Sequence, residues 1–112
     1  MQDSKEKLSI NSKVKEIQLL EQNLQALLMQ KQAYQMELYN VTGALEELSK
    51  SKDEVYKVIG QVMIRSSKEE MERELKKKSE LLSLRIKTIE KQESSLSEKI
   101  SSLKSEIISA TK

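Results

Sequence analysis

Apolar residues return along the first half of the chain at alternating steps of three and four. From Ile17 to Leu48 these steps continue without a break, and a heptad repeat of this length is typical of a coiled coil. The repeat comprises Ile17, Leu20, Leu24, Leu27, Lys31, Tyr34, Leu38, Val41, Leu45 and Leu48. Further upstream, Val14, Ile17 and Leu20 are separated by two steps of three, which predicts a stammer in the coiled coil.

A second repeat of the same kind occupies the last part of the chain. Ser67 followed by Glu70 fits the S-x-x-E capping box, so we predict that a second helix begins near Ser67. Its repeat comprises Leu75, Ser79, Leu82, Ile86, Ile89, Glu93, Leu96, Ile100, Leu103, Ile107 and Ala110. For Lys31, the charged member of the first repeat, two interpretations remain open. Its side chain either snorkels to solvent or sets register or partner choice.

The segment EVYKVIGQVMIR, residues 54–65, interrupts the helical pattern with β-forming residues. The preceding SKSKD, residues 49–53, predicts the end of the first helix, because Ser and Asp favour turns and caps. Gly60-Gln61 is the Gly-X pair of a type II′ hairpin turn. We therefore predict strands over residues 54–59 and 62–66.

The two helical runs, residues 10–49 and 67–110, have similar lengths and are joined by this tight hairpin. We predict a mainly α fold class: an antiparallel two-helix coiled-coil hairpin with one central β-hairpin. Residues whose numbers add to about 120 would then pair, with Ile17 facing the region of Leu103 and Ile10 facing Ala110. The chain would form one domain, 1–112, made of a helix (1–49), a hairpin segment (50–66) and a second helix (67–112).

The predicted β-hairpin lacks a cover of its own. A lone two-stranded hairpin is marginal in water, its two outer edges are unpaired, and its sequence places apolar residues on both faces. We expect it to join the hairpins of other subunits in an oligomeric β-barrel platform; the simpler alternative is a local cap on the helices. The predicted interface comprises Val55, Tyr56, Val58, Ile59, Gly60, Val62, Met63 and Ile64.

Composition narrows the function classes. With 20 basic and 18 acidic residues the net charge is +2, which does not favour strong binding to nucleic acid. The chain contains no His and no Cys, so the usual acid–base, thiol and transition-metal constellations are absent, and we expect neither an enzyme nor a cofactor or metal. No apolar run is long enough to span a membrane or to form a secretory signal, so the expected location is the cytoplasm.

Three stretches carry a family resemblance: VYKVIG at 55–60, LRIKTIEKQE at 84–93 and LMQKQAYQMELYNVTGALEEL at 28–48. They resemble the archaeal-like β-type subunit of prefoldin. The resemblance implies a hetero-oligomeric hexamer of two α-type and four β-type subunits, with a double β-barrel from which six coiled-coil arms project. It also implies an ATP-independent chaperone (holdase) that binds unfolded proteins and passes them to a group II cytosolic chaperonin.

The resemblance further implies that clients bind at the arm tips, where the coiled coil frays. The residues concerned are Leu8, Ile10, Val14, Ile17, Leu103, Ile107 and Ile108. Seven serines between Ser94 and Ser109 favour such fraying, because Ser is a mediocre helix former. Leu8 and Ile108 lie off the repeats and are the better candidates for exposed contacts. The alternative function is a structural coiled-coil adaptor that oligomerises through the hairpin.

Overall fold

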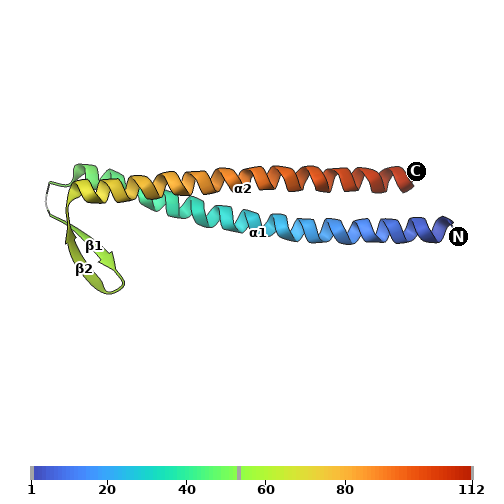
Figure 1. The fold of residues 1–112 in the computed structure, drawn as a ribbon, viewed down its shortest axis with the longest axis horizontal. Coiled ribbons are helices and arrows are strands. Elements are labelled where there is room, and N and C mark those ends of the chain that lie inside the picture. The colour runs from blue at the N-terminus through green and yellow to red at the C-terminus, as the bar shows by residue number, and fades with distance from the viewer. Residues whose placement is uncertain (1, 53, 112) are drawn as a thin grey trace. The chain divides into compact units, whose positions relative to one another are not determined.

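Two long helices and one β-hairpin make up the fold (Figure 1). The structure, a computed structural model, describes residues 2–52 and 54–111. The elements are α1 (Gln2–Lys50), β1 (Val55–Ile59), β2 (Val62–Ser66) and α2 (Lys68–Thr111). The predicted mainly α class with one central hairpin is confirmed, and each strand begins and ends within one residue of its predicted bounds.

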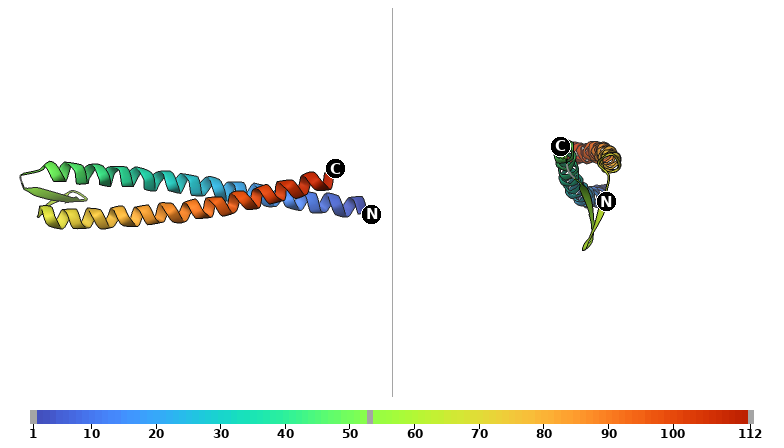
Figure 2. Two further views of the ribbon diagram at one scale, coloured as in Figure 1. Left: turned by 90° about the horizontal axis from the view of Figure 1, so that it is seen from above. Right: turned by 90° about the vertical axis from the view of Figure 1, so that its left-hand side faces the viewer.

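The chain forms two compact units, and each contains a segment of both helices. The terminal unit consists of Met1–Lys31 and Thr88–Lys112, and the hairpin unit consists of Gln32–Lys87. Within each unit the α1 and α2 segments lie side by side and run in opposite directions, as both side views show (Figures 1 and 2). The antiparallel pairing predicted from the two repeats is therefore present in both units.

The terminal unit has a core of repeat residues. Ile17, Leu20 and Ile100 are buried together, and the residues packed against them are Leu24, Leu96, Leu103 and Ile107. On the rim of this core the Lys13 ammonium pairs with the Glu106 carboxylate at 3.4 Å. The residue numbers of that pair add to 119, and Leu103 packs against the cluster that contains Ile17, in line with the predicted register.

The stammer predicted near Val14 is wrong. The Val14 side chain is 39% exposed, whereas Lys13 is half-buried. The repeat therefore continues upstream through Lys13 to Ile10, in the usual steps of four and three. An apolar pattern misses this position because a lysine can lay its aliphatic stem along a seam while its ammonium group reaches a carboxylate at the edge.

At the chain ends, helix α2 continues beyond its last apolar contact. Ala110, the last member of the predicted repeat, is exposed, so the buried seam ends at Ile107. The helix nevertheless extends to Thr111, whose hydroxyl lies 3.1 Å from the Ile107 and Ile108 carbonyl oxygens. The seven serines between Ser94 and Ser109 are all exposed and lie within the helix, which contains no break at this end.

The hairpin unit has its own core and its own helix caps. Its buried residues are Val41, Leu48, Leu82 and Ile86. The Lys68 ammonium donates to the carbonyl oxygens of Ser49 and Ser51 at 3.3 Å each. A cation is favourable there because the last carbonyl groups of a helix lack partners within it. At the start of α2 the Glu70 amide donates to the Ser67 hydroxyl at 3.1 Å, which confirms the predicted cap.

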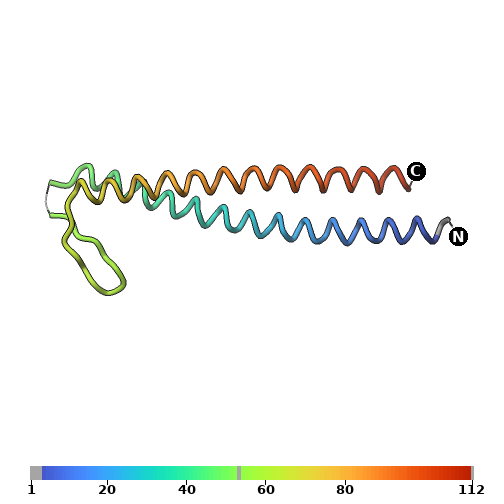
Figure 3. Tube along the Cα trace, viewed as in Figure 1, coloured from blue at the N-terminus to red at the C-terminus, as the bar shows by residue number. Residues whose placement is uncertain are grey.

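A tight turn joins β1 and β2 (Figure 3), and its backbone geometry is the predicted one. Gly60 has a φ of 60°, as the first central residue of a type II′ turn requires. Among the described residues no other has a positive φ, so Gln61 lacks the second positive φ that a type I′ turn would need. The strands pair antiparallel in the register Val55↔Ser66 to Ile59↔Val62.

Candidate functional site

The strand register divides the hairpin side chains between two faces. Residues directly opposite each other share a face, and successive residues alternate. One face therefore holds Val55, Lys57, Ile59, Val62, Ile64 and Ser66. The other holds Tyr56, Val58, Met63 and Arg65. Each face carries large apolar side chains, so covering only one of them would leave the other in water.

Most of these apolar side chains are open to solvent in the single chain. Tyr56, Val58, Ile59, Val62, Met63 and Ile64 have exposed fractions between 47 and 70%. Val55, at the start of β1, is half-buried. Exposed apolar patches on this scale mark interaction surfaces in soluble proteins. Neither strand has a partner on its outer edge among the residues that the structure describes.

Polar side chains hold the base of the hairpin. The Lys57 ammonium pairs with the Glu74 carboxylate of α2 at 2.9 Å, which links β1 to that helix. Glu54 accepts a hydrogen bond from the Tyr56 hydroxyl at 2.8 Å and forms an ion pair with Arg65 on the neighbouring strand. These contacts use the polar groups near the helices and leave the outer half of the hairpin apolar.

In the terminal unit, the residues predicted as client contacts fall into three groups. Leu8, Val14 and Ile108 are exposed, by 69%, 39% and 57%. The half-buried residues are Ile10, Leu103 and Ile107. Ile17 is only 8% exposed and belongs to the core. In the closed coiled coil the repeat position of Ile17 points it at α2, so Ile17 could contact a client only where the helices part.

A surface hollow of about 530 Å³ joins two of the exposed residues. Leu8 and Val14 lie six positions apart on α1 and both line it. The other lining residues are Asn11, Ser12, Lys15 and Gln18. The hollow therefore combines two apolar side chains with amide, hydroxyl and ammonium groups, a surface that can take an apolar side chain and satisfy polar groups beside it. Leu19 is also exposed on this helix, by 58%, and was not among the predicted contacts.

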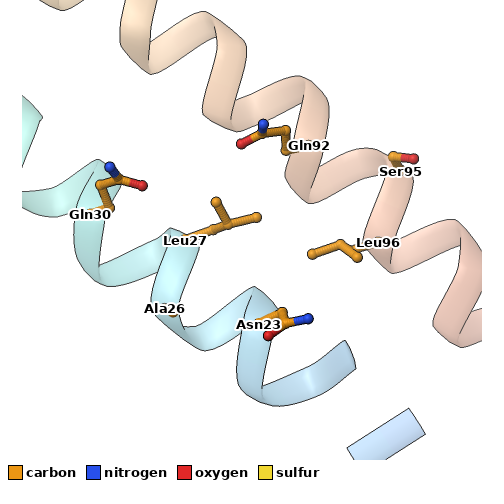
Figure 4. Close-up of a pocket in the computed structure, with 7 residues that line it drawn as sticks. All are labelled: Asn23, Ala26, Leu27, Gln30, Gln92, Ser95 and Leu96. Atoms are coloured by element: carbon orange, nitrogen blue, oxygen red, sulfur yellow. The ribbon is translucent and has the colours of Figure 1, made fainter. Parts of the chain in front are cut away.

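A polar contact inside the helical seam was also missed. The Lys31 ammonium lies 3.1 Å from Glu93 Oε2, with side-chain exposed fractions of only 19% and 17%. Next to this pair is a hollow of about 500 Å³, where Leu27 and Leu96 lie between helices and Asn23, Ala26, Gln30, Gln92 and Ser95 complete the lining (Figure 4). The signal was present in the sequence, because these two residues are the charged members of the two repeats.

No group of three or more acidic, His or Cys side chains that could hold a metal ion occurs within residues 2–52 and 54–111. Over the same part of the chain, neither helix has a stretch apolar enough and long enough to cross a lipid bilayer.

Two long helices joined by one central antiparallel hairpin define a class of coiled-coil proteins, and comparisons identify its family. The sequence matches the family described as "Prefoldin subunit" over residues 11–112. The chain belongs to the prefoldin family, as a β-type subunit. This is a family of chaperones and not of enzymes. The family resemblance noted in the sequence is thereby confirmed.

Individual relatives support this assignment. The chain is 36% identical over 101 residues to the prefoldin subunit beta of Caldivirga maquilingensis, covering 88% of this chain and 84% of the relative. It is 38% identical over 92 residues to that of Archaeoglobus fulgidus, covering 80% and 79%. The crystal structure of the prefoldin beta subunit from Thermococcus strain KS-1 matches with a TM-score of 0.86 and 33% identity, over 91% of each chain.

Proposed function

We propose that this chain is a subunit of an ATP-independent holdase, which binds unfolded proteins and transfers them to a group II chaperonin in the cytoplasm. The observation that carries the proposal is the hairpin of a prefoldin-family chain with large apolar side chains exposed on both faces. Such a surface needs partner subunits. An assembly that holds several coiled coils together is what a holdase without ATP requires.

In this proposal, the hairpin is the assembly site. Val55, Tyr56, Val58, Ile59, Gly60, Val62, Met63 and Ile64 pair with the hairpins of neighbouring subunits and close a β-barrel. Closure leaves no free strand edge and makes one apolar face the barrel interior, so the other face needs further contacts in the assembly. The partner is an α-type prefoldin subunit, with two α-type and four β-type chains in a hexamer. The exposed fractions of these side chains and the open outer edges of β1 and β2 support this role.

Client binding belongs to the terminal unit. Leu8, Val14 and Ile108 offer exposed apolar contacts in the closed coiled coil. Ile10, Leu103 and Ile107 join them where the helix ends part, and Ile17 becomes accessible only if the core of the unit opens. Burial of a few hundred Å² of apolar surface, at about 25 cal/mol per Å², gives only weak binding per subunit. Several subunits on one platform raise the avidity for an extended client while each contact still releases without ATP.

The test is reconstitution with an α-type prefoldin subunit. The mixture should form a particle with the mass of a hexamer, and this particle should suppress the aggregation of a chemically denatured client. Deleting residues 1–12 and 105–112 should abolish suppression and leave the mass unchanged. A particle that assembles but never suppresses aggregation would instead support the structural adaptor. Loss of assembly on deletion of the termini would show that the hairpin is not the assembly site.

A further inference from the structure

The polar contact between Lys31 and Glu93 occupies an unusual place for two charges. The two side chains lie in the seam of the terminal unit, with ammonium and carboxylate 3.1 Å apart. Glu93 uses only Oε2 in this pair, and its other oxygen, Oε1, is buried without a hydrogen-bond partner. Two leucines at these positions would avoid both desolvation and the unsatisfied oxygen. Stability of the coiled coil is therefore a poor explanation for this pair.

Alternative registers reveal what the pair prevents. Antiparallel helices can slip past each other by one heptad and still match apolar layers, since both repeats are regular. In one direction such a slip moves Lys31 from Glu93 to Ile100. In the other direction it moves Glu93 to Leu24. Every one-heptad slip thus buries both charges against aliphatic side chains, while the native register pairs them.

The pair also opposes association between like helices of two copies. A parallel pairing of two α1 segments would place Lys31 beside a second Lys31, and a parallel pairing of two α2 segments would place Glu93 beside a second Glu93. Like charges at facing seam positions repel, and polar residues at such positions are well attested as selectors of register and oligomer state. The other ion pairs of the terminal unit cannot select the register in this way, because their charges stay in contact with water in any register. Lys104 and Glu21, for example, have side-chain exposed fractions of 57% and 50%.

We propose that the Lys31–Glu93 pair is a specificity-determining contact, which fixes the register of the coiled coil and directs α1 to its own α2. This role is independent of client capture and of assembly through the hairpin. It resolves the two interpretations of Lys31 in favour of register and partner choice. The pair acts by raising the free energy of slipped registers and of pairing between like helices. It does not act by stabilising the native register.

Engineered disulfides can measure the register directly, because the chain has no native cysteine. Leu27→Cys with Leu96→Cys reports the native register, since both positions line the same hollow between the helices. Leu27→Cys with Ile89→Cys, or with Leu103→Cys, reports the two one-heptad slips. Leu27→Cys alone reports pairing of two α1 helices, as a disulfide between chains. Each reporter is oxidised in the full-length chain and quantified by mass spectrometry.

In the native background the two slip reporters should stay at or below about 1% of the native one, because stranding a buried charge disfavours an arrangement on the order of 100-fold. In the Lys31→Leu/Glu93→Leu variant, slipped or interchain disulfides should rise at least about tenfold. The charge-swapped Lys31→Glu/Glu93→Lys variant should restore the native pattern, because it keeps the pair. Glu21→Leu/Lys104→Leu makes the same exchange at an exposed ion pair and should leave the pattern native.

Three results would overturn the proposal. If the double-leucine variant keeps only the native disulfide, other contacts fix the register. If the charge swap fails to restore the native pattern in a chain that circular dichroism shows to be folded, the pair is not the cause. If the exposed control scrambles the register as much as the seam variant, the effect comes from added apolar surface.

Discussion

The terminal unit buries the apolar residues of its heptad repeats, whereas the hairpin leaves most of its apolar residues exposed. In the terminal unit, repeat residues such as Ile17 and Ile100 find partners within the same chain and are almost fully buried. In the hairpin, Val58 and Met63 face each other across the strands and remain 65% and 70% exposed. The difference follows from geometry: two amphipathic helices have one apolar stripe each and can satisfy each other, whereas a two-stranded sheet has two faces and two edges.

This contrast separates two kinds of exposed apolar residue. Those of the hairpin form a contiguous surface in a fixed register, which suits a partner of one defined shape. Those of the terminal unit are fewer and are mixed with polar side chains, as in the hollow that Leu8 and Val14 share, which suits partners of many shapes. Mutations that change one region without the other can test this division.

The largest effect is expected from a charge in the hairpin. Val58→Asp should abolish assembly with an α-type subunit, because burying a carboxylate in a barrel wall costs several kcal/mol, on the order of 3 or more. Light scattering would measure the particle mass, and circular dichroism would check that the helices persist. Gln61→Asp places the same charge in the exposed turn and serves as the control. An unchanged mass for Val58→Asp would remove the hairpin from the assembly interface.

A smaller effect is expected from the exposed residues of the terminal unit. The triple variant Leu8→Ser, Val14→Ser and Ile108→Ser should weaken client capture by about tenfold, equivalent to roughly 1.4 kcal/mol, and leave the particle mass unchanged. Suppression of client aggregation, measured against particle concentration, gives the comparison. Leu81→Ser with Leu84→Ser removes exposed leucines from the hairpin unit as a matched control. Equal losses in both variants would mean that capture has no preference for the terminal unit.

The two glycines distinguish the turn from the helices. Gly60→Ala should destabilise the hairpin by about 1–2 kcal/mol, because a Cβ is strained at a positive φ. Gly43→Ala should stabilise α1 by roughly 1 kcal/mol. Neither added Cβ would come within 4 Å of an atom beyond its own local backbone, so backbone conformation decides whether each substitution stabilises or destabilises. Dissociation of the assembled particle in urea would report the Gly60→Ala change, and unfolding of the helices would report the Gly43→Ala change. Stability changes of the same sign in both variants would contradict these expectations.

The smallest effect concerns the exposed serines of α2. Ser101→Ala and Ser105→Ala should each stabilise the terminal segment by about 0.5 kcal/mol or less, from helix propensity alone. Hydrogen exchange of the last turns of α2 should slow accordingly. If parting of the helix ends contributes to capture, aggregation suppression should fall at the same time. Slower exchange with full suppression would assign capture to the residues already exposed in the closed coil.

The sequence predicted most of the fold, because the signals for it are local. The positive φ of Gly60 and the amide hydrogen bond to Ser67 each depend on a few neighbouring residues. The heptad steps predicted which face of each helix is buried. Where apolar periodicity was the only guide, it failed at Lys13, since a long charged side chain can occupy a seam position.

Contacts between segments distant in sequence were harder to predict. Lys31 and Glu93 each stood out in their own repeats, but their pairing depends on the register between two helices. The predicted register pairs residues whose numbers add to about 120, whereas the numbers of Lys31 and Glu93 add to 124. The burial of Ile17 likewise depends on its partner residues on α2, which a pattern within α1 alone does not name.

The two open edges of the β-hairpin also bear on whether assembly stops at a closed particle. A chain that can bond on both edges forms a finite ring only if the partners turn through a full circle, and otherwise it continues to add copies. If this subunit were in excess over the proposed α-type chain, unpaired strand edges would remain and could keep adding copies, which favours open-ended polymers. In the proposed assembly, the ratio of the two kinds of chain would therefore decide between closed particles and open polymers.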